Sequence, residues 1–133
     1  RAAIGMTAHI VFTEWDADRP ATQSAWGVEN IIRQRIGFAG LLLTDDIDMQ
    51  ALDGSIPERA VRSLEAGCDL VLNCWGKMDD MRGIVEACGS IREESAARLE
   101  NALASVSVPA EPADIGALCG MRDALFTAAG LEP

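Results

Sequence analysis

Three short apolar runs alternate with segments of helical spacing along the first two thirds of the chain. The runs cover residues 4–12 (IGMTAHIVF), 40–44 (GLLLT) and 69–74 (DLVLNC). None repeats its apolar residues with the period of an amphipathic helix, and continuous runs of this length are typical of strands buried on both faces. We therefore predict three buried strands.

Helices are predicted between and after these strands. Ser24 is placed to cap the first helix, Gly37 ends it, and Pro57 fits the first turn of the second. The alternation of strands and helices with short connections predicts an α/β fold in which right-handed crossovers join the strands of a parallel sheet. The predicted helices cover residues 25–36, 57–65, 77–87, 91–106 and 118–129.

The character of the chain changes in its last third. Pro109 and Pro112 interrupt an Ala/Pro-rich stretch between the last two predicted helices. We therefore divide the chain into residues 1–103, which carry the strands, and residues 104–133, which form a linker and a terminal helix.

The composition opposes two classes of partner. With 21 acidic and 11 basic residues the net charge is −10, so no basic face can bind a phosphate backbone, and nucleic acid is not expected as a partner. No run approaches the roughly 18 apolar residues of a membrane span and no secretory leader opens the sequence, so we expect a cytoplasmic protein without a membrane partner. Arg1 stands close to a predicted strand with no initiator Met, which indicates that the beginning of the protein is missing.

The four cysteines are spread along the chain without a Cys-x-x-Cys pair or a Cys/His cluster. This spacing suggests neither a zinc site nor a disulfide framework, so we predict free thiols, most of them buried. No metal and no cofactor is expected. The residues are Cys68, Cys74, Cys88 and Cys119.

Polar residues gather where the predicted strands end. His9, Asp45, Asp46 and Asn73 all fall at carboxyl ends of strands, the edge at which parallel sheets bind ligands. Spacing alone explains them equally well as a chain emerging into water. Asp69 begins a strand at the opposite edge, where a stabilising role is expected.

The segment TDDIDM (44–49) is compatible with three chemistries: a magnesium-binding carboxylate pair, a phosphoacceptor, or a glycosidase nucleophile. Residues 46–54 resemble the stretch around the phosphorylated Asp of a signalling receiver, with Gln50 in place of its proline. A receiver also needs an acidic pair where this chain has residues 5–7 (GMT), and a Lys-Pro pair where it has residues 96–98 (AAR). The receiver alternative is therefore disfavoured.

Four ordered blocks of the sequence, within about residues 4–103, resemble family 3 glycoside hydrolases of the bacterial β-N-acetylhexosaminidase type. Any one block alone would be a weak signal, but their shared order and spacing make a strong one. The blocks are GMTAHI (5–10), DADRPATQS (16–24), IIRQRIGFAGLLLTDDIDMQAL (31–52) and RAVRSLEAGCDLVLNC (59–74).

The resemblance implies a (β/α)8 barrel, of which this chain would be the last three βα units followed by C-terminal helices. It implies a retaining enzyme that releases terminal β-N-acetylglucosamine from N-acetylglucosaminyl muropeptides during cytoplasmic cell-wall recycling. The nucleophile would be Asp45, which follows Thr44 in the motif, and it would form a covalent glycosyl-enzyme. Asp46 is then expected to support the site by hydrogen bonding.

Three further residues are candidates for lining the site. His9 matches the His of the family's M-x-x-H-I strand, and we expect it to have a site-lining or structural role. Met49 belongs to the active-site motif, and Trp75, just past the third strand, could stack on a sugar.

The family's acid/base His loop, which resembles K-H-F-P-G-H-G, has no counterpart here. We therefore expect the remainder of the barrel to lie outside these residues and the isolated segment to be inactive. The alternative is a non-catalytic half-barrel that serves as an assembly module.

Overall fold

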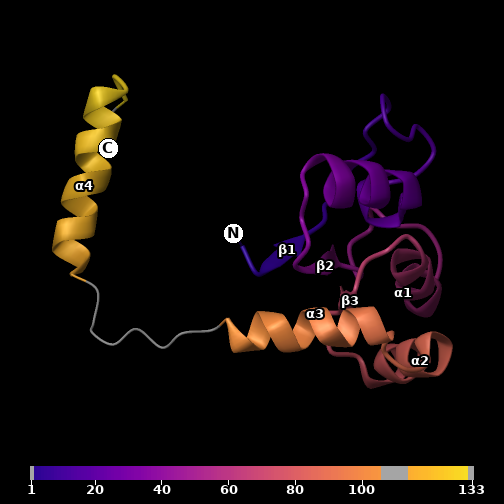
Figure 1. The fold of residues 1–133 in the computed structure, drawn as a ribbon. Coiled ribbons are helices and arrows are strands. Elements are labelled where there is room, and N and C mark those ends of the chain that lie inside the picture. The colour runs from indigo at the N-terminus through magenta and orange to yellow at the C-terminus, as the bar shows by residue number, and fades with distance from the viewer. Residues whose placement is uncertain (1, 106–113, 132–133) are drawn as a thin grey trace.

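The structure is a computed structural model that describes residues 2–105 and 114–131. Three strands, β1 (Ile4–Met6), β2 (Leu41–Asp46) and β3 (Leu70–Leu72), form a parallel sheet in the order β1-β2-β3 (Figure 1). The predicted α/β fold with a parallel sheet is confirmed. The helical elements are η1 (Ala21–Gln23), η2 (Gly27–Arg35), α1 (Ile56–Glu65), α2 (Met78–Cys88), α3 (Glu93–Ala104) and α4 (Ile115–Ala128).

The first strand is shorter and more exposed than predicted. It ends at Met6, after which the Thr7 N–H makes one more sheet bond to the Leu43 carbonyl, at 2.9 Å. Ile4 is 48% exposed and Met6 is 55% exposed. The prediction of a buried strand over residues 4–12 is therefore wrong. An apolar run does not reveal how many neighbours a strand has, and within the described residues β1 pairs with β2 alone.

The third strand is also shorter than the predicted residues 69–74, and its residues are only half-buried. β2 lies between its two neighbours, with Leu41 and Leu42 almost fully buried. Of the three predicted buried strands, only β2 fits that description. It is the rigid element on which the carboxyl edge of the sheet is built.

The first long helix begins where the sequence predicts. The Gly27 N–H donates to the Ser24 hydroxyl oxygen at 3.0 Å, which is the expected N-cap. From Gly27 onward η2 is π-helical, since the Ile36 N–H donates to the carbonyl five residues back, that of Ile31, at 2.8 Å. The predicted extent of this helix is right, but its wider turn was not predicted.

Helix α1 has a reciprocal cap at its start. The Ser55 N–H and hydroxyl both donate to the Glu58 carboxylate, each at 2.8 Å, and Pro57 occupies the first turn as predicted. Predictions for α2 and α3 agree with their observed bounds to within a few residues, as far as the described part of the chain reaches.

The core consists of two apolar clusters that both draw on β2 or its continuation. Val28 of η2, Leu42 of β2 and Cys68 form one cluster, with Ile32 and Phe38 packed against it. The other contains Ile47 and Leu52, which follow β2, and Ala60 of α1; around it lie the partly buried Ile56, Val71, Ile84 and Cys88.

Helix α4 stands clear of the other elements in Figure 1. It spans Ile115–Ala128 rather than the predicted 118–129, while Pro109 and Pro112 of the predicted linker lie outside the described residues. The division into 1–103 and 104–133 stays a prediction. No helix in the described residues has the length and apolar character needed to cross a membrane.

All four cysteines are free thiols, as predicted, but only Cys68 is buried. Burial raises the pKa of the Cys68 thiol to about 12. Cys74 is exposed, and Cys88 and Cys119 are intermediate, so the prediction of mostly buried thiols is wrong. Cysteine is hydrophobic enough to be buried, but its position at the end of β3 leaves Cys74 in contact with water.

Candidate active site at the carboxyl edge

The carboxyl end of β2 contains an irregularity in its pairing with β3. Leu43 pairs with Leu70 and Asp46 pairs with Leu72, so three steps along β2 oppose two along β3. The Leu72 N–H donates to the side-chain hydroxyl of Thr44 at 2.9 Å, and that hydroxyl therefore takes the place of a ladder carbonyl. Such a bulge changes the direction of the side chains around it, and Asp45 lies within it.

The two adjacent carboxylates at this edge have different environments. Asp46 Oδ1 accepts hydrogen bonds from the N–H groups of Asp48 and Cys74, both at 3.1 Å. The half-buried Asp45 uses one oxygen, Oδ1, to accept the Asp46 N–H at 2.8 Å, and its other oxygen has no hydrogen-bond partner within the described residues. The Oδ2 atom of Asp46 likewise has no hydrogen-bond partner within the described residues, so the two carboxylates differ in what Oδ1 holds: the turn and the loop after β3 for Asp46, and only the adjacent N–H for Asp45.

The edge carries uncompensated negative charge. Burial opposes ionisation of Asp46, but the N–H groups of Asp48 and Cys74 lower the pKa of this carboxyl below its ordinary value. Local desolvation of the sulfur, followed by the charges of the nearby carboxylates, raises the pKa of the exposed Cys74 thiol. Among the described residues no Lys or Arg forms an ion pair with Asp45, Asp46 or Asp48. Such an edge favours a reaction in which positive charge develops.

His9 connects the loop after β1 to this edge. Its Nε2–H donates to the Asp46 carbonyl at 2.9 Å, since a carbonyl can only accept. Its Nδ1 is hydrogen-bonded to the Thr22 hydroxyl at 2.8 Å, and the Thr22 hydroxyl in turn lies 2.9 Å from the Thr7 hydroxyl. Both ring nitrogens are thus engaged, and His9 joins the Asp46 backbone to the Thr22 side chain next to the candidate site.

Met49 and Trp75 follow β2 and β3, and both side chains are exposed. The Lys77 ammonium lies 4.6 Å from the centre of the Trp75 ring, within cation–π range. Asn73 Nδ2 donates to Asp48 Oδ2 at 2.7 Å, and the Asn73 Oδ1 atom is buried without a partner. The structure thus brings all the sequence-predicted site residues to the carboxyl ends of the strands or the loops that follow them.

Two residues of this region were missed by the sequence analysis. Asp48 is almost fully buried and holds the loop after β3. Arg59, also buried, donates to the carbonyls of Ile47 and Met49 at 2.9 and 3.1 Å and so shapes the loop after β2. The signal in the sequence was that Arg59 directly precedes Ala60, one of the small apolar residues of the predicted helix.

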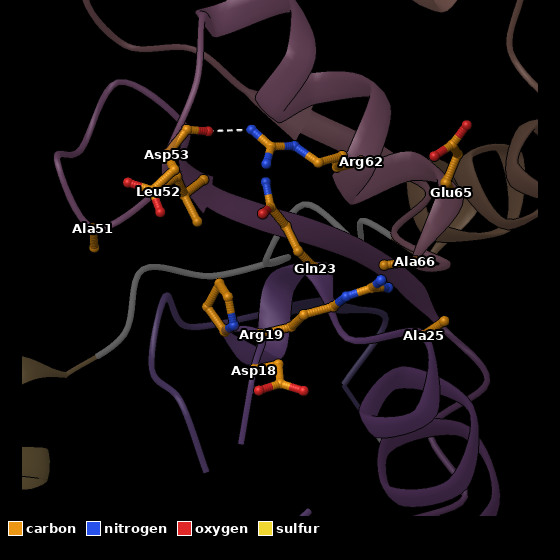
Figure 2. Close-up of a pocket in the computed structure, with 11 residues that line it drawn as sticks. Asp18, Arg19, Gln23, Ala25, Ala51, Leu52, Asp53, Arg62, Glu65 and Ala66 are labelled. Carbon is orange, nitrogen blue, oxygen red and sulfur yellow. Dashed lines mark hydrogen bonds between the residues drawn. The ribbon is translucent and has the colours of Figure 1, made fainter. Parts of the chain in front are cut away.

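No group of three or more His, Cys, Asp or Glu side chains in the described residues is arranged to hold a metal ion. A polar cavity of about 390 Å³ lies between the loop after β1 and helix α1 (Figure 2). Arg19, Arg62 and Glu65 line it, and Arg62 donates to the Asp53 carbonyl. Asp45 and Asp46 are not among its lining residues.

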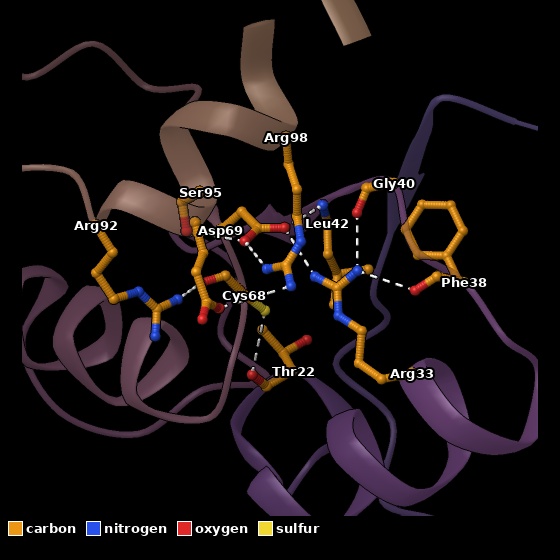
Figure 3. Close-up of polar contacts among 11 residues, drawn as sticks. Thr22, Arg33, Phe38, Gly40, Leu42, Cys68, Asp69, Arg92, Ser95 and Arg98 are labelled. Carbon is orange, nitrogen blue, oxygen red and sulfur yellow. Dashed lines mark hydrogen bonds and ion pairs between the residues drawn. The ribbon is translucent and has the colours of Figure 1, made fainter. Parts of the chain in front are cut away.

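The amino edge of the sheet has a fully paired aspartate (Figure 3). Asp69 Oδ2 accepts from Arg33 Nη2 and the Leu42 N–H, both at 2.8 Å, and Oδ1 accepts from Ser95 Oγ at 2.8 Å and Arg98 Nη1 at 2.7 Å. Burial opposes ionisation, but these donors lower the pKa of Asp69 below its ordinary value. This placement agrees with the stabilising role expected from the sequence.

Fold and site together define a parallel α/β protein with an acidic site at the carboxyl ends of its strands, the arrangement found in barrel hydrolases. The chain belongs to glycosyl hydrolase family 3, because the family model "Glycosyl hydrolase family 3 N terminal domain" matches residues 2–108. The family resemblance is thereby confirmed, and the receiver-like alternative has lost its support.

Among curated proteins, the chain is similar to the Beta-hexosaminidase of Tolumonas auensis, with 35% identity over 102 residues that cover 75% of this chain and 29% of that protein. The Beta-hexosaminidase of Photobacterium profundum is 33% identical over 100 residues, 74% of this chain and 28% of the relative. The chain therefore spans less than a third of the length of these relatives.

Solved structures show the same similarity. The glycoside hydrolase family 3 beta-N-acetylglucosaminidase from Paenibacillus sp. str. FPU-7 aligns with a TM-score of 0.67 and 25% identity, covering 85% of this chain and 24% of that one. NagZ from Neisseria gonorrhoeae aligns with a TM-score of 0.62 and 34% identity, covering 75% and 28%.

Proposed function

We propose that this chain provides the nucleophile of a retaining β-N-acetylhexosaminidase, and that the nucleophile is Asp45. The observation that carries the proposal is the difference between the two adjacent carboxylates. Asp46 Oδ1 is committed to holding the turn after β2 and the loop after β3 through two backbone N–H groups, whereas the one hydrogen bond that Asp45 accepts within the described residues comes from its neighbour in the chain. A covalent mechanism requires a carboxylate that is free to approach the anomeric carbon rather than committed to holding the backbone.

The reaction would proceed in two displacements. The Asp45 carboxylate attacks the anomeric carbon while the glycosidic C–O bond breaks and an acid protonates the leaving oxygen. Water, deprotonated by the same acid/base group, then attacks the anomeric carbon and releases Asp45. That group would lie on a His loop outside these residues, roughly 5–5.5 Å from Asp45. His9 would act as a positioning residue, because both of its nitrogens are engaged.

The substrate would be a terminal β-linked N-acetylglucosamine, consistent with the names of the relatives, which are beta-hexosaminidases and a beta-N-acetylglucosaminidase. Within that class we propose N-acetylglucosaminyl muropeptides, cleaved in the cytoplasm during cell-wall recycling. Asp46, Met49 and Trp75 would support or contact the sugar.

We propose further that residues 1–103 complete a (β/α)8 barrel together with chain outside these residues. The outer edge of β1 pairs with no strand among the described residues, and Ile4 and Met6 are about half exposed there. Unpaired strand edges with apolar neighbours favour the addition of further strands. The short span of the chain relative to the curated proteins supports the same conclusion.

Trapping of the covalent intermediate tests the role of Asp45. The protein at its natural length is incubated with a slow 5-fluoro analogue that keeps the 2-acetamido group of N-acetylglucosamine, and its proteolytic peptides are examined by mass spectrometry. We expect a glycosyl adduct on the peptide that contains Asp45, and its loss in Asp45→Ala. Asp46→Ala is the matched control and should still form the adduct. An adduct on Asp46 would mean that the two roles are reversed.

A second experiment separates the enzyme from a non-catalytic assembly module. Residues 1–133 made alone should show no turnover of an aryl N-acetyl-β-glucosaminide, because Asp45 lacks a partner to protonate the leaving oxygen. They should also self-associate in light scattering through the exposed sheet edge. A monodisperse monomer with sharp near-ultraviolet circular dichroism would contradict the partial-barrel proposal. A natural-length protein without turnover would favour the assembly module.

A further inference from the structure

We propose that Asp48 is a positioning residue that clamps the loop after β3 and so holds Trp75 as a platform for the sugar ring bound beside Asp45. The inference rests on the proposed function and adds to it a specificity element, the loop that begins at Asn73.

The geometry of the clamp comes from one carboxylate oxygen. Asp48 is only 3% exposed, and its Oδ2 accepts three hydrogen bonds. The donors are Asn73 Nδ2 at 2.7 Å, the Cys74 N–H at 3.1 Å and the Trp75 N–H at 3.2 Å. Three consecutive residues of the loop are thus fixed to the turn after β2. Asp46 adds a further bond to the Cys74 N–H at 3.1 Å.

Burying a carboxylate without a cation is costly unless hydrogen-bond donors replace its hydration. No Lys or Arg in the described residues pairs with Asp48, so loop dipoles alone compensate its charge. Because these donors must converge on one oxygen, the loop has little freedom to move. Asp48 therefore fixes the position of the loop after β3 relative to β2.

The side chain that this loop presents is suited to a sugar. Trp75 is 58% exposed although its backbone is held, and Lys77 lies over its ring at 4.6 Å. An indole whose backbone is already held loses less conformational entropy than one on a mobile loop when the apolar C–H face of a pyranose packs on it. Asn73 Oδ1, buried and unpartnered, shows that the loop is placed at a cost in hydrogen bonding.

The test compares Asp48→Ala, Trp75→Ala and the double variant in the protein at its natural length, with an aryl N-acetyl-β-glucosaminide as substrate. We expect KM to rise about three- to tenfold in each single variant, the effect of losing one aromatic contact, with a smaller change in kcat. The double variant should be no worse than either single variant, because both changes remove the same contact. Asp53→Asn, an exposed carboxylate in the preceding loop, is the matched control and should change neither constant.

A spectroscopic readout tests the clamp without turnover. In a natural-length background in which Trp15, Trp26 and any tryptophan outside these residues are replaced by Phe, Trp75 is the one remaining emitter, and acrylamide should quench its emission more strongly in Asp48→Ala. N-acetylglucosamine should protect Trp75 from acrylamide in the parent protein and less so in Asp48→Ala. If Asp48→Ala does not fold, Asp48→Asn, which keeps one acceptor oxygen, is measured in its place.

Unchanged KM together with unchanged Trp75 quenching would overturn the proposal, and so would strictly additive effects in the double variant. A parent protein without turnover would instead refute the proposed function, and sugar protection of Trp75 would then decide the clamp on its own. A uniform loss of thermal stability with unchanged KM and unchanged sugar protection would assign Asp48 a purely structural role and would likewise overturn the proposal.

Discussion

The aspartates at the two edges of the sheet have opposite environments. At the amino edge, Asp69 is fully buried and receives two arginines, a serine and a backbone N–H. At the carboxyl edge, Asp45, Asp46 and Asp48 receive hydrogen bonds but no ion pair from the described residues. Arginines compensate the charge of the aspartate at the amino edge, whereas the aspartates at the carboxyl edge have no cationic partner within the described residues.

This difference separates stability from reactivity. A carboxylate surrounded by fixed cations serves packing, since its charge is already compensated and its oxygens are occupied. A carboxylate held only by backbone dipoles keeps its nucleophilicity and its attraction for developing positive charge. Substitutions at the two edges should therefore change different measured quantities.

The largest effect is expected from Asp45→Ala. In the natural-length protein we expect kcat to fall by about 10⁴-fold or more, because a covalent mechanism loses its nucleophile. The melting temperature should remain close to that of the parent, since the Asp45 side chain makes only one hydrogen bond in the described residues. Steady-state release of the aryl group and calorimetry measure both quantities. Activity within tenfold of the parent would dismiss Asp45 as nucleophile.

Asp69→Ala should show the reverse behaviour. Removing this side chain leaves two guanidinium groups without their shared partner, and the free energy of unfolding should fall by about 3–5 kcal/mol. The protein that remains folded should keep its kcat, because Asp69 lies at the far edge of the sheet. Urea unfolding and active-site titration separate the two effects. A loss of kcat per folded molecule would contradict the division between the edges.

The two arginines around Asp69 should contribute differently to the free energy of unfolding. The Arg33 side chain is 12% exposed and also donates to the carbonyls of Phe38 and Gly40, whereas the Arg98 side chain is 30% exposed. We expect Arg33→Ala to lower the free energy of unfolding by about 2–3 kcal/mol and Arg98→Ala by about 1 kcal/mol. Equal losses in urea unfolding would argue against this ranking.

The pH dependence of stability should reflect Asp69. Its native pKa lies below the ordinary value of 3.8, because the Leu42 N–H, Arg98, Ser95 and Arg33 outweigh the effect of burial. A depressed native pKa contributes stability that is complete above the unfolded pKa and is lost as the pH falls through the native value. Thermal unfolding below about pH 4 should therefore be less steeply pH-dependent in Asp69→Asn than in the parent. Superimposable profiles would show that Asp69 does not contribute.

The smallest expected effect is that of metal removal. A covalent glycosidase uses no ion at its carboxylates, so dialysis against a chelator should leave kcat within about twofold of the untreated protein. A clear loss that magnesium restores would return the carboxyl edge to the metal-binding alternative.

The sequence was informative where local chemistry is unambiguous. Ser24 and Pro57 follow from capping and proline geometry, and both are where they were predicted. The short apolar run located β2, although the strand continues past the predicted residues 40–44 and ends at Asp46. The exposure of β1 could not be predicted in this way, because it depends on how many strands lie beside it.

The pattern of apolar and polar residues also could not predict the contacts inside the candidate site. Asp48 looks like one more acidic residue in a polar turn, and only the fold brings it next to the N–H groups that follow β3. The bulge at Thr44 is similarly invisible, because it results from a hydroxyl that replaces a carbonyl in the ladder. Contacts between residues far apart in the chain decided both features.

The π-helical turn of η2 has a consequence for insertions and deletions. The bond from the Ile36 N–H to the Ile31 carbonyl accommodates one residue more than an α-helical turn would hold. A relative that lacks this residue could still form a helix, but each residue removed rotates the rest of the helix by about 100°. Arg33 would then point away from Asp69. Among relatives, we therefore expect a change in the length of this segment to be accompanied by a change in the residue that reaches Asp69.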